Sequence, residues 1–440
     1  MVGPEYEPPE LQTPPAFINS IDDSIIPEGM VWKDLFASPE LNALLQKVRD
    51  NNHDLKAAWQ SVLASRAAIR RFRSDGFPDV KAGIRGNEFT NSDALSSSGS
   101  GGSGSRYDAD LAASWEFDLF GSIRRSVQAA EASAEVREAL YQDLMFTLQA
   151  DVASLYFQIL SYQSEIELLQ RSRETRHESL DLIQQRFQAG TVTELTVAQT
   201  SSLLATAEIR LFAVQRTQNS LIYALGVLLG QTPDRFEFEP TPLELDPPII
   251  PAGIPGDLLT RRPDLRAAER DLAAAHELVG LAKASYFPTI TLSGTLGLAA
   301  REWDELFSSR AALDSLRPGI SIPLFEGGRL RANEQQAIAI FEQRLELYKQ
   351  DVIGAVAEVE DTLQSIALLG EQEKAIARSV EASQQARRIS MLQYQRGLSD
   401  FINALDAERT ALNADQQFVQ IKRAQFVATI NLIRALGGSW

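Results

Sequence analysis

The order of hydrophobic and polar residues changes period several times along the chain, and each change marks a predicted element. Short stretches alternate strictly between apolar and polar residues, which is typical of a strand whose two faces meet different surroundings. The apolar members of these stretches are Val80, Ala82, Ile84, Tyr107, Ala109, Leu111, Ala113, Trp115, Phe117, Ile290, Leu292, Leu296, Leu298, Ile320 and Ile322. The pattern predicts four strands of about ten residues in two pairs.

Each predicted strand pair has its own connecting segment. Asn91–Ser105, which is rich in serine and glycine, joins the first pair, and Ala299–Asp314 joins the second. Small and polar residues of this kind do not supply a packed core. We therefore predict a long, mobile surface loop in both places.

After each strand pair the apolar residues recur every three or four positions, the spacing of one face of an α-helix. In the first stretch they are Leu144, Leu148, Val152, Leu155, Ile159, Tyr162, Ile166, Leu169, Leu180, Ile183 and Phe187, with Arg173 and Arg176 in the gap. All 19 prolines fall in residues 4–78, 233–288 or 318–323, so none interrupts this stretch. We predict a helix over Ser122–Ala189, about 100 Å long at roughly 1.5 Å per residue.

After each long helix, the chain is predicted to reverse direction and return as a second helix. Gly190 lies where a left-handed residue closes a helix, and a returning helix follows from Thr193 to Leu229. The second half predicts the same arrangement. A helix over Arg329–Arg396 breaks at Gly397 and returns from Phe401.

The chain repeats itself after about half its length. Asp54-Leu55-Lys56-Ala57-Ala58 returns 210 residues later as Asp264-Leu265-Arg266-Ala267-Ala268, and Phe77-Pro78 returns at the same interval as Phe287-Pro288. Leu119-Phe120 returns after 205 residues as Leu324-Phe325, Gly190 after 207 as Gly397, and Ala224-Leu225-Gly226 after 211 as Ala435-Leu436-Gly437. Landmarks in one order with little drift indicate two copies of one unit, each a strand pair on a long helical hairpin.

The polar face of the first strand pair carries Lys81, Arg85, Asp108, Asp110 and Glu116. Such strands are typical of a transmembrane β-barrel with a wet interior, and equally of a soluble antiparallel sheet with one solvated face. Four strands do not close a barrel, and open edges in lipid leave backbone groups unpaired at a cost of several kcal/mol each. In a membrane, several copies would have to combine their strands.

Composition excludes several classes of function. There are 42 basic and 59 acidic residues, a net charge of −17, whereas nucleic-acid binding requires clustered Lys and Arg. The acidity suits solubility or a lumen that attracts cations. The absence of cysteine excludes disulfides and thiolate metal sites, and no cofactor is expected. His53, His177 and His276 lack ligand spacing and are predicted to be surface residues.

No constellation for catalysis is present: there is no Ser-His-Asp set, no acid/base carboxylate pair and no nucleotide fingerprint. An enzyme is therefore not predicted. No run approaches the ~18 apolar residues of a membrane-spanning helix, and Leu221–Leu229 is the densest one. If the chain lies in a membrane, we expect it to span as strands or to be anchored.

Several motifs occur in one order along nearly the whole chain. They are Val2-Gly3-Pro4-Glu5-Tyr6-Glu7-Pro8-Pro9, Trp32 with Phe36, Trp115-Glu116-Phe117-Asp118-Leu119-Phe120-Gly121, Arg261-Arg262-Pro263-Asp264-Leu265, Phe287-Pro288, and Ala435-Leu436-Gly437-Gly438-Ser439-Trp440. In this set the chain resembles an outer-membrane factor of the TolC superfamily, in the NodT-type lipoprotein branch that serves resistance–nodulation–division and related efflux pumps. The resemblance implies an α+β membrane protein, internally duplicated, that contributes four strands to a trimeric transmembrane β-barrel above a long periplasmic α-helical barrel.

The resemblance also divides the chain. It implies an N-terminal extended segment and equatorial helix over 1–53, a first α-barrel repeat over 54–79 and 122–230, β-barrel strands over 80–121 and 288–326, an equatorial linker over 231–263, a second α-barrel repeat over 264–287 and 327–436, and a C-terminal equatorial tail over 437–440. The implied partners are two further copies in a homotrimer, a periplasmic adaptor, an inner-membrane pump and outer-membrane lipid. Nucleic acid is not among them.

Members of this branch carry a lipidated cysteine at or just before the position of Met1, and the chain has no cysteine. Nothing at Met1 is similar to a signal peptide. We interpret Met1 as a processing boundary, so the lipid anchor is expected from the resemblance only. The expected location is the outer membrane of a Gram-negative bacterium, with an extension into the periplasm.

Two kinds of functional residue follow from the resemblance. The turns Gly190-Thr191-Val192 and Gly397-Leu398-Ser399 match the adaptor-contacting tips; the alternative is an ordinary hairpin turn. Ile402, Asp406 and Arg409 match a closing gate with an apolar ring and a carboxylate ring, and their spacing places them on one helix face. The alternative is a solvated aspartate with an arginine three residues on. The corresponding Leu195 and Gln199 carry no charge.

The function predicted from these observations is the exit duct of a tripartite efflux pump. A soluble periplasmic coiled-coil scaffold without a pore would explain the helices but not the alternating strands. An enzyme would explain neither. The transported substrate leaves no signal in the sequence, because family ducts accept what the pump delivers.

Overall fold

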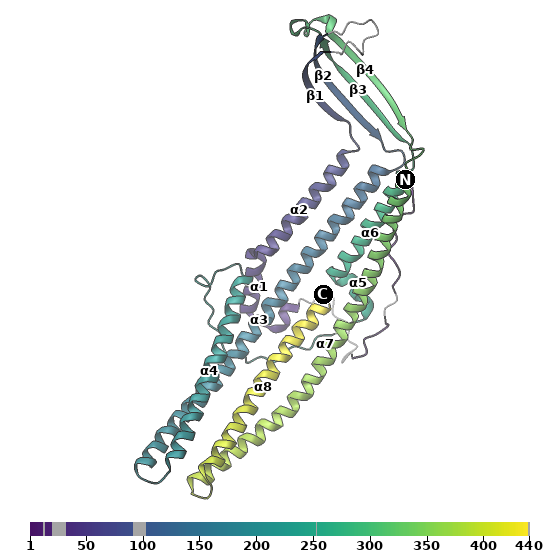
Figure 1. Ribbon diagram of the computed structural model, residues 1–440. Coiled ribbons are helices and arrows are strands. Elements are labelled where there is room, and N and C mark those ends of the chain that lie inside the picture. Colours follow the sequence, from purple (N-terminus) through teal and green to yellow (C-terminus); the bar gives the residue numbers. More distant parts are fainter. Residues whose placement is uncertain (12–13, 20–31, 91–102, 252, 439–440) are drawn as a thin grey trace. The chain divides into compact units, whose positions relative to one another are not determined.

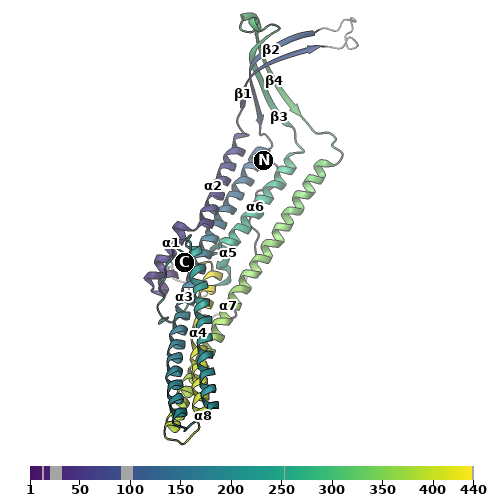
Figure 2. The same cartoon turned by 60° about the vertical axis from the view of Figure 1, so that its left-hand side comes forward.

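The computed structural model describes residues 1–11, 14–19, 32–90, 103–251 and 253–438 (Figures 1 and 2). Its helices are α1 (Pro39–Asn51), α2 (His53–Ser74), α3 (Ser122–Gln188), α4 (Glu194–Leu228), α5 (Leu258–Arg261), α6 (Pro263–Ala284), α7 (Arg329–Gln395) and α8 (Phe401–Ala435). Its strands are β1 (Asp79–Thr90), β2 (Ser103–Phe117), β3 (Thr289–Ala300) and β4 (Ala312–Ser321). Short 3₁₀ turns are η1 (Trp32–Phe36), η3 (Pro255–Asp257), η4 (Trp303–Glu305) and η5 (Ser309–Ala311).

The internal repeat is confirmed by the lengths of the helices. The long helices α3 and α7 both have 67 residues, and the returning helices α4 and α8 both have 35. The shorter helices α2 and α6 both have 22. The long helices end within a residue of the predicted positions because proline is absent from their interiors and a glycine follows each C-terminus.

The four strands form one antiparallel sheet in the order β1-β2-β3-β4 (Figure 1). The register places apolar side chains opposite one another, as in the pairs Ala82↔Leu111, Leu111↔Leu296 and Ile290↔Ile320. The polar side chains share the other face, where Arg85 donates a hydrogen bond to Asp110 over 2.7 Å. The predicted alternation is confirmed, and the apolar face is exposed, as at Val80, Ile84 and Leu316.

The predicted loops are only partly correct. In the first segment, β2 begins at Ser103, and residues 91–102 lie outside the described part of the chain. In the second segment, strands reach Ala300 and resume at Ala312, and most of the residues between them are exposed. Leu306 is fully buried and Trp303 contacts the ring of Tyr107, with 5.5 Å between centroids. The segment is a surface connection, as predicted, although it is shorter than expected and contains the turns η4 and η5; its mobility stays a prediction.

The chain divides into two compact units. Unit 1 consists of Met1–Leu11, Gln60–Ala139 and Ala267–Gln350, and it contains the sheet. Unit 2 consists of Gln12–Trp59, Leu140–Arg266 and Asp351–Trp440, and it contains both hairpin turns. The residues Ser439 and Trp440 of the last sequence motif lie outside the described residues.

In unit 1, the motif Trp115–Gly121 connects the sheet to the helices. The indole Nε1 of Trp115 donates to the carbonyl oxygen of Gly76 over 3.0 Å. The carboxylate of Asp118 accepts the backbone N–H groups of Ile123 and Arg124, over 3.1 and 3.0 Å, at the start of α3. These two amides would otherwise have no partner in the first helical turn, so Asp118 fixes the point where strand becomes helix.

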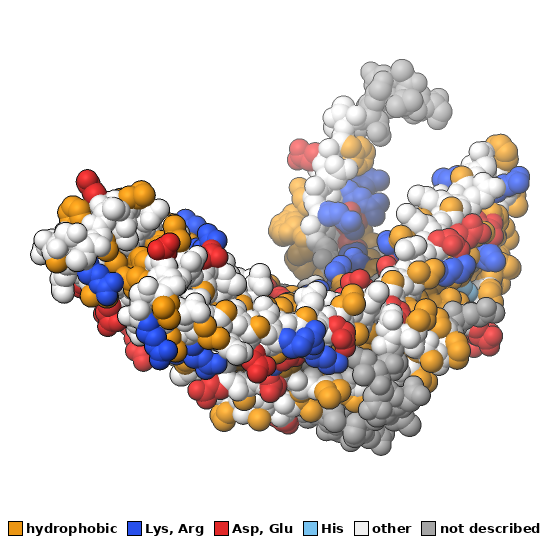
Figure 3. All heavy atoms as spheres, turned by 90° about the horizontal axis from the view of Figure 1, so that it is seen from below, with side chains coloured by type: hydrophobic (Ala, Val, Ile, Leu, Met, Phe, Trp, Pro, Cys, Tyr) orange, Lys and Arg blue, Asp and Glu red, His pale blue; other side chains and the backbone are white. Residues whose placement is uncertain are grey.

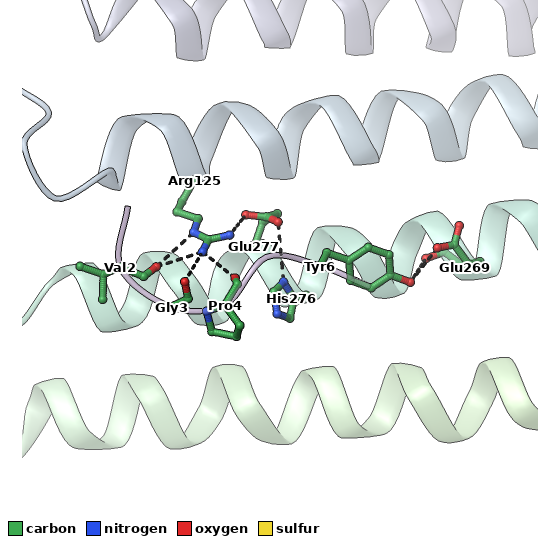
Figure 4. A network of polar contacts seen from close by, with 8 residues as sticks. All are labelled: Val2, Gly3, Pro4, Tyr6, Arg125, Glu269, His276 and Glu277. Atoms are coloured by element: carbon green, nitrogen blue, oxygen red, sulfur yellow. Dashed lines mark hydrogen bonds and ion pairs between the residues drawn. The ribbon is translucent and has the colours of Figure 1, made fainter. Parts of the chain in front are cut away.

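The core of unit 1 is built from small residues. Ala132 of α3 packs on Ala273 and Ala274 of α6, and Tyr6 of the N-terminal segment covers them. Figure 4 shows how that segment is held. The guanidinium of Arg125, which is 1% exposed, donates to the carbonyl oxygens of Val2, Gly3 and Pro4 and to Glu277 over 2.5 Å. Each of these buried donors therefore has an acceptor.

The predicted surface position of His276 is wrong. Its ring lies between those of Tyr6 and Phe341, with centroids 5.6 and 5.7 Å away, and its Nδ1 is 3.6 Å from Glu277 (Figure 4). The covering residue Tyr6 lies at the far N-terminal end of the sequence, so local spacing could not reveal it. His53 and His177 are exposed, as predicted.

The core of unit 2 is aromatic. Phe157 of α3 stacks on Phe426 of α8, with 4.4 Å between ring centroids, and Phe36 packs beside it at 4.9 Å. Trp32 is buried next to Phe146. The sequence motif that contains Trp32 and Phe36 therefore anchors the N-terminal segment to the long helices.

A second motif of unit 2 forms an ion-pair centre. Arg262 contacts the carboxylates of Asp264 and Glu358, both at 2.8 Å, and donates to the carbonyl oxygen of Ala435. One residue thus joins the start of α6, the middle of α7 and the end of α8 within this unit.

Among the described residues, no helix is both long and apolar enough to cross a membrane.

Candidate functional site

The two hairpin turns have the same backbone geometry. Gly190 and Gly397 have φ angles of 74° and 71°, in the left-handed region that glycine adopts without strain. After Gly190, the N–H of Thr191 donates to the carbonyl oxygen of Arg186 over 2.9 Å; after Gly397, Leu398 donates to Gln393 over the same distance. These bonds satisfy the last carbonyls of α3 and α7. Both turns lie at the same end of unit 2 (Figures 1 and 2).

Most of the residues at the turns are exposed to solvent. Gly190, Thr191 and Gly397 are exposed, Leu398 is 74% exposed, and Val192 and Ser399 are partly covered. An exposed leucine at the end of a hairpin is available for contact with another molecule. The six predicted tip residues therefore lie together at one end of the unit, on two separate turns.

An aromatic contact that the sequence did not predict ties the two turns together. Arg186 Nη1 donates to the hydroxyl oxygen of Tyr394 over 2.7 Å, and its guanidinium lies 5.3 Å from the centre of that ring. Tyr394 in turn packs on Phe401, with 4.9 Å between centroids. Arg186 and Tyr394 are each within about one helical turn of a glycine, but their pairing depends on two hairpins meeting, which local periodicity does not encode.

The three predicted gate residues share one face of α8. Arg409 Nη2 donates to Asp406 Oδ1 over 2.6 Å, and both side chains are exposed. Ile402 lies one turn before Asp406 and is exposed as well. This pair joins two exposed side chains three residues apart on one helix, which is the arrangement of the alternative interpretation, so the closing gate stays a prediction.

The counterparts of the gate residues on the first hairpin face them. A cavity of about 490 Å³ is lined by Gln199, Ser202 and Leu203 of α4 and by Ile402, Asp406 and Arg409 of α8. Because the repeat interval is 207 residues here, Gln199 corresponds to Asp406 and Ser202 to Arg409. One wall of the cavity is therefore charged and the matching wall is neutral.

A buried ion pair lies behind this face. Arg176 of α3 and Glu408 of α8 are both buried, with Arg176 Nε 3.8 Å from Glu408 Oε1. Arg176 Nη1 also donates to the carbonyl oxygen of Leu203 over 2.8 Å. Burial raises the pKa of the Glu408 carboxyl, although Arg176 and Arg387 oppose the rise, and burial lowers the pKa of Arg176.

Glu408 also lines a second, polar cavity of about 470 Å³ between α3, α7 and α8. Its other charged lining residues are Arg171, Arg387 and Asp415. Arg176 fills the gap in the apolar stripe of α3, as predicted, and is buried, whereas Arg173, predicted with it, is exposed. Glu408 was not predicted. It lies in a stripe of buried small residues between Ala404 and Ala411, whereas the predicted helix faces rested on large apolar residues.

The face of the molecule in Figure 3 carries interspersed acidic and basic side chains rather than a block of one sign. Within the described residues, no group of three His, Asp or Glu side chains is placed to hold a metal ion. The candidate site is thus a set of surfaces and interhelical cavities, and it contains no reaction centre that we can identify in the described part of the chain.

A duplicated chain that has both a sheet with an exposed apolar face and long helical hairpins is typical of the class of channel-forming outer-membrane subunits. The family model for outer membrane efflux proteins matches residues 44–231 and 254–438, one match in each repeat. The chain belongs to the outer membrane efflux protein family, so the resemblance to the TolC superfamily is confirmed.

Individual relatives cover nearly the whole chain. The solvent efflux pump outer membrane protein SrpC of Pseudomonas putida is 33% identical over 416 residues, which are 93% of this chain and 87% of the relative. The pyoverdine export outer membrane protein OpmQ, also of Pseudomonas putida, is 31% identical over 421 residues, 94% and 89% of the two chains. The structure of the outer-membrane channel OprN superposes with a TM-score of 0.91 at 31% identity and covers 99% of both chains.

These similarities establish an outer-membrane efflux channel subunit as the function, in preference to a scaffold without a pore. They concern channels and not enzymes.

Proposed function

We propose that three copies of this chain form the exit duct of a tripartite efflux pump in the outer membrane of a Gram-negative bacterium. The duct receives substrate from an inner-membrane transporter through a periplasmic adaptor and releases it outside. The observation that carries this proposal is the four-stranded sheet, whose apolar face is exposed and whose outer strands β1 and β4 have no further strand beside them in the described chain.

Physical chemistry then requires more than one copy. Unpaired backbone groups at the edges of β1 and β4 would cost several kcal/mol each in lipid. Pairing β4 of one copy with β1 of the next removes both edges, and three copies supply twelve strands, a number within the range of known single barrels. The long helices of the same copies continue the tube away from the membrane.

We assign the tip and gate residues as part of this proposal. Exposed Leu398 and the two glycine turns form the surface that meets the adaptor. Ile402, Asp406 and Arg409 form the closing constriction, where three Asp406 carboxylates around one axis repel each other and the Arg409 pairs offset that repulsion.

A lipid anchor at or before position 1 belongs to the proposal as well. It rests on the resemblance to the lipoprotein branch alone, since the chain has no cysteine of its own to carry a lipid. The backbone N–H of Val2 donates to the carbonyl oxygen of Phe120 over 3.1 Å, three residues beyond the end of β2. A lipid attached there would lie level with the base of the strands. Two relatives of similar identity are named for solvent efflux and for pyoverdine export, so no substrate is assigned to the duct itself.

The test is purification from outer membranes in detergent, followed by light scattering and planar-bilayer recording. We expect a particle of three protein chains that forms pores. A monomer that stays in solution without detergent and forms no pore would reject the duct and favour a coiled-coil scaffold.

A further inference from the structure

A pair of aromatic rings lies at the base of the two central strands, β2 and β3. Phe120 follows the end of β2, and Phe287 precedes the start of β3, so the two residues lie at the bases of neighbouring strands. Their rings stack with 4.9 Å between centroids and 25° between planes. This contact joins the first repeat to the second within one chain.

The repeat supplies a second pair of the same kind, but its members lie at the two outer strands. Phe325 corresponds to Phe120 and follows β4, and Phe77 corresponds to Phe287 and precedes β1. Phe325 is 90% exposed and Phe77 is 70% exposed. The same motif is therefore stacked where two strands are neighbours and exposed where each strand is an edge.

The helices below the sheet show the same difference. Ala273 of α6 is 5% exposed because it packs on α3. Its counterpart 210 residues earlier is Leu63 of α2, a larger apolar residue that is 41% exposed. The face of α2 that contains Leu63 is therefore exposed, whereas the corresponding face of α6 is buried against α3.

We infer that Phe77 of one copy stacks on Phe325 of a neighbouring copy, in the arrangement that Phe120 and Phe287 have inside each copy. This inference rests on the proposed oligomeric duct and assigns one of its contacts. If β4 of one copy pairs with β1 of the next, the bases of those strands become neighbours, and two exposed rings are covered at each junction. The ring of sheets then has the same aromatic pair at every boundary between repeats, whether that boundary lies inside a chain or between chains.

Cysteine cross-linking tests the contact directly, because the chain contains no cysteine of its own. The double variant Phe77→Cys/Phe325→Cys is treated in outer membranes with a short bis-maleimide, which spans the gap left by two rings better than a disulfide does. We expect linked dimers and trimers on denaturing gels. Their yield should exceed that of either single variant roughly tenfold or more, because assembly holds the two thiols at a high effective concentration.

The matched control is Phe120→Cys/Phe287→Cys. Its thiols lie within one chain, so the linked protein should still run as a monomer on the denaturing gel, and the link should appear as one cross-linked peptide in mass spectrometry. Co-expression of the Phe77→Cys and Phe325→Cys single variants adds a further check, since only linked dimers, and no trimers, are expected from that mixture.

The outcomes separate this inference from the proposed function. Trimers by light scattering, with the control linked but Phe77→Cys/Phe325→Cys left unlinked, would overturn the stacking and place these rings against lipid. A wild-type protein without oligomers would reject the duct itself, and the stacking with it.

Discussion

The two helical hairpins share one backbone design and differ in chemistry. Each consists of a 67-residue and a 35-residue helix joined at a glycine with a left-handed backbone. Near the turn, however, the second hairpin carries Asp406 and Arg409 where the first carries Gln199 and Ser202. Duplication has preserved the length of the hairpin, whereas the charged residues on this face occur in one copy only.

The difference continues into the interior. Glu408 is buried beside Arg176, while the positions that correspond to them in the other repeat are Ser201 and Ser383. An ion pair therefore joins α3 to α8 within a chain. Ser383 of α7 and Ser201 of α4 carry hydroxyl groups at the corresponding positions, and these two helices would meet between copies in the proposed duct. Mutations at the α3–α8 positions should therefore change stability more than mutations at the corresponding α7 and α4 positions.

The largest effect is expected at the exposed charges. Asp406→Ala/Arg409→Ala removes both the carboxylate ring and the arginines that pair with it, so the proposed constriction loses its closing contacts. Basal conductance in a planar bilayer should rise to several times that of wild type. The matched variant Gln199→Ala/Ser202→Ala, on the facing wall of the same cavity, should leave conductance unchanged. Equal conductance in all three proteins would reject the assignment of the gate to the second hairpin.

The buried pair should contribute most to stability. Arg176→Ala leaves the Glu408 carboxylate in the interior without its nearest counter-charge, which typically costs about 3 kcal/mol. The thermal midpoint, followed by intrinsic fluorescence in detergent, should fall clearly. Ser383→Ala, at the corresponding position, should cost less than about 1 kcal/mol. A loss of equal size in both variants would show that the charge difference does not matter for packing.

Substitution of the two turn glycines tests the left-handed backbone conformation that the hairpins share. Gly190→Ala and Gly397→Ala each force a side chain into the left-handed region, at a cost of about 1 kcal/mol, and neither new Cβ would meet an atom within 4 Å. Both variants should therefore lower the thermal midpoint equally. A large difference between them would mean that one turn is held by contacts that the other lacks.

The hairpins also show what the sequence can predict. Helix ends were correct because a proline-free stretch closed by glycine is a local signal, and Ser122 and Gly190 mark one such stretch. The alternation of strand faces was correct for the same reason. The contacts of Arg186 with Tyr394 and of Tyr6 with His276 were not predicted, because the first joins the two repeats and the second joins the N-terminal segment to the second repeat.

The candidate site divides in the same way. Motif matching located Asp406 and Arg409, and their pairing needs only one helix. Glu408, two residues from Asp406, was missed because its burial depends on α3 and α7 packing around it. A charged residue within a stripe of alanines is the signal that would have identified it.

The smallest effect concerns the protonation of Glu408. Burial raises the pKa of its carboxyl above the ordinary value, so the folded state holds this proton more tightly than the unfolded state does. The contribution of Glu408 to stability is then greatest below its unfolded pKa and is lost as the pH rises through its folded pKa. The glutamine of Glu408→Gln does not titrate. The thermal midpoint of this variant should therefore rise relative to that of wild type as the pH increases above about 4.5. Ser201→Ala, the counterpart on α4, should keep the wild-type pH dependence. If the curves for Glu408→Gln and wild type stay parallel, the carboxylate is ionised in the folded state throughout that range, and the attraction of Arg176 and Arg387 at least balances the effect of burial.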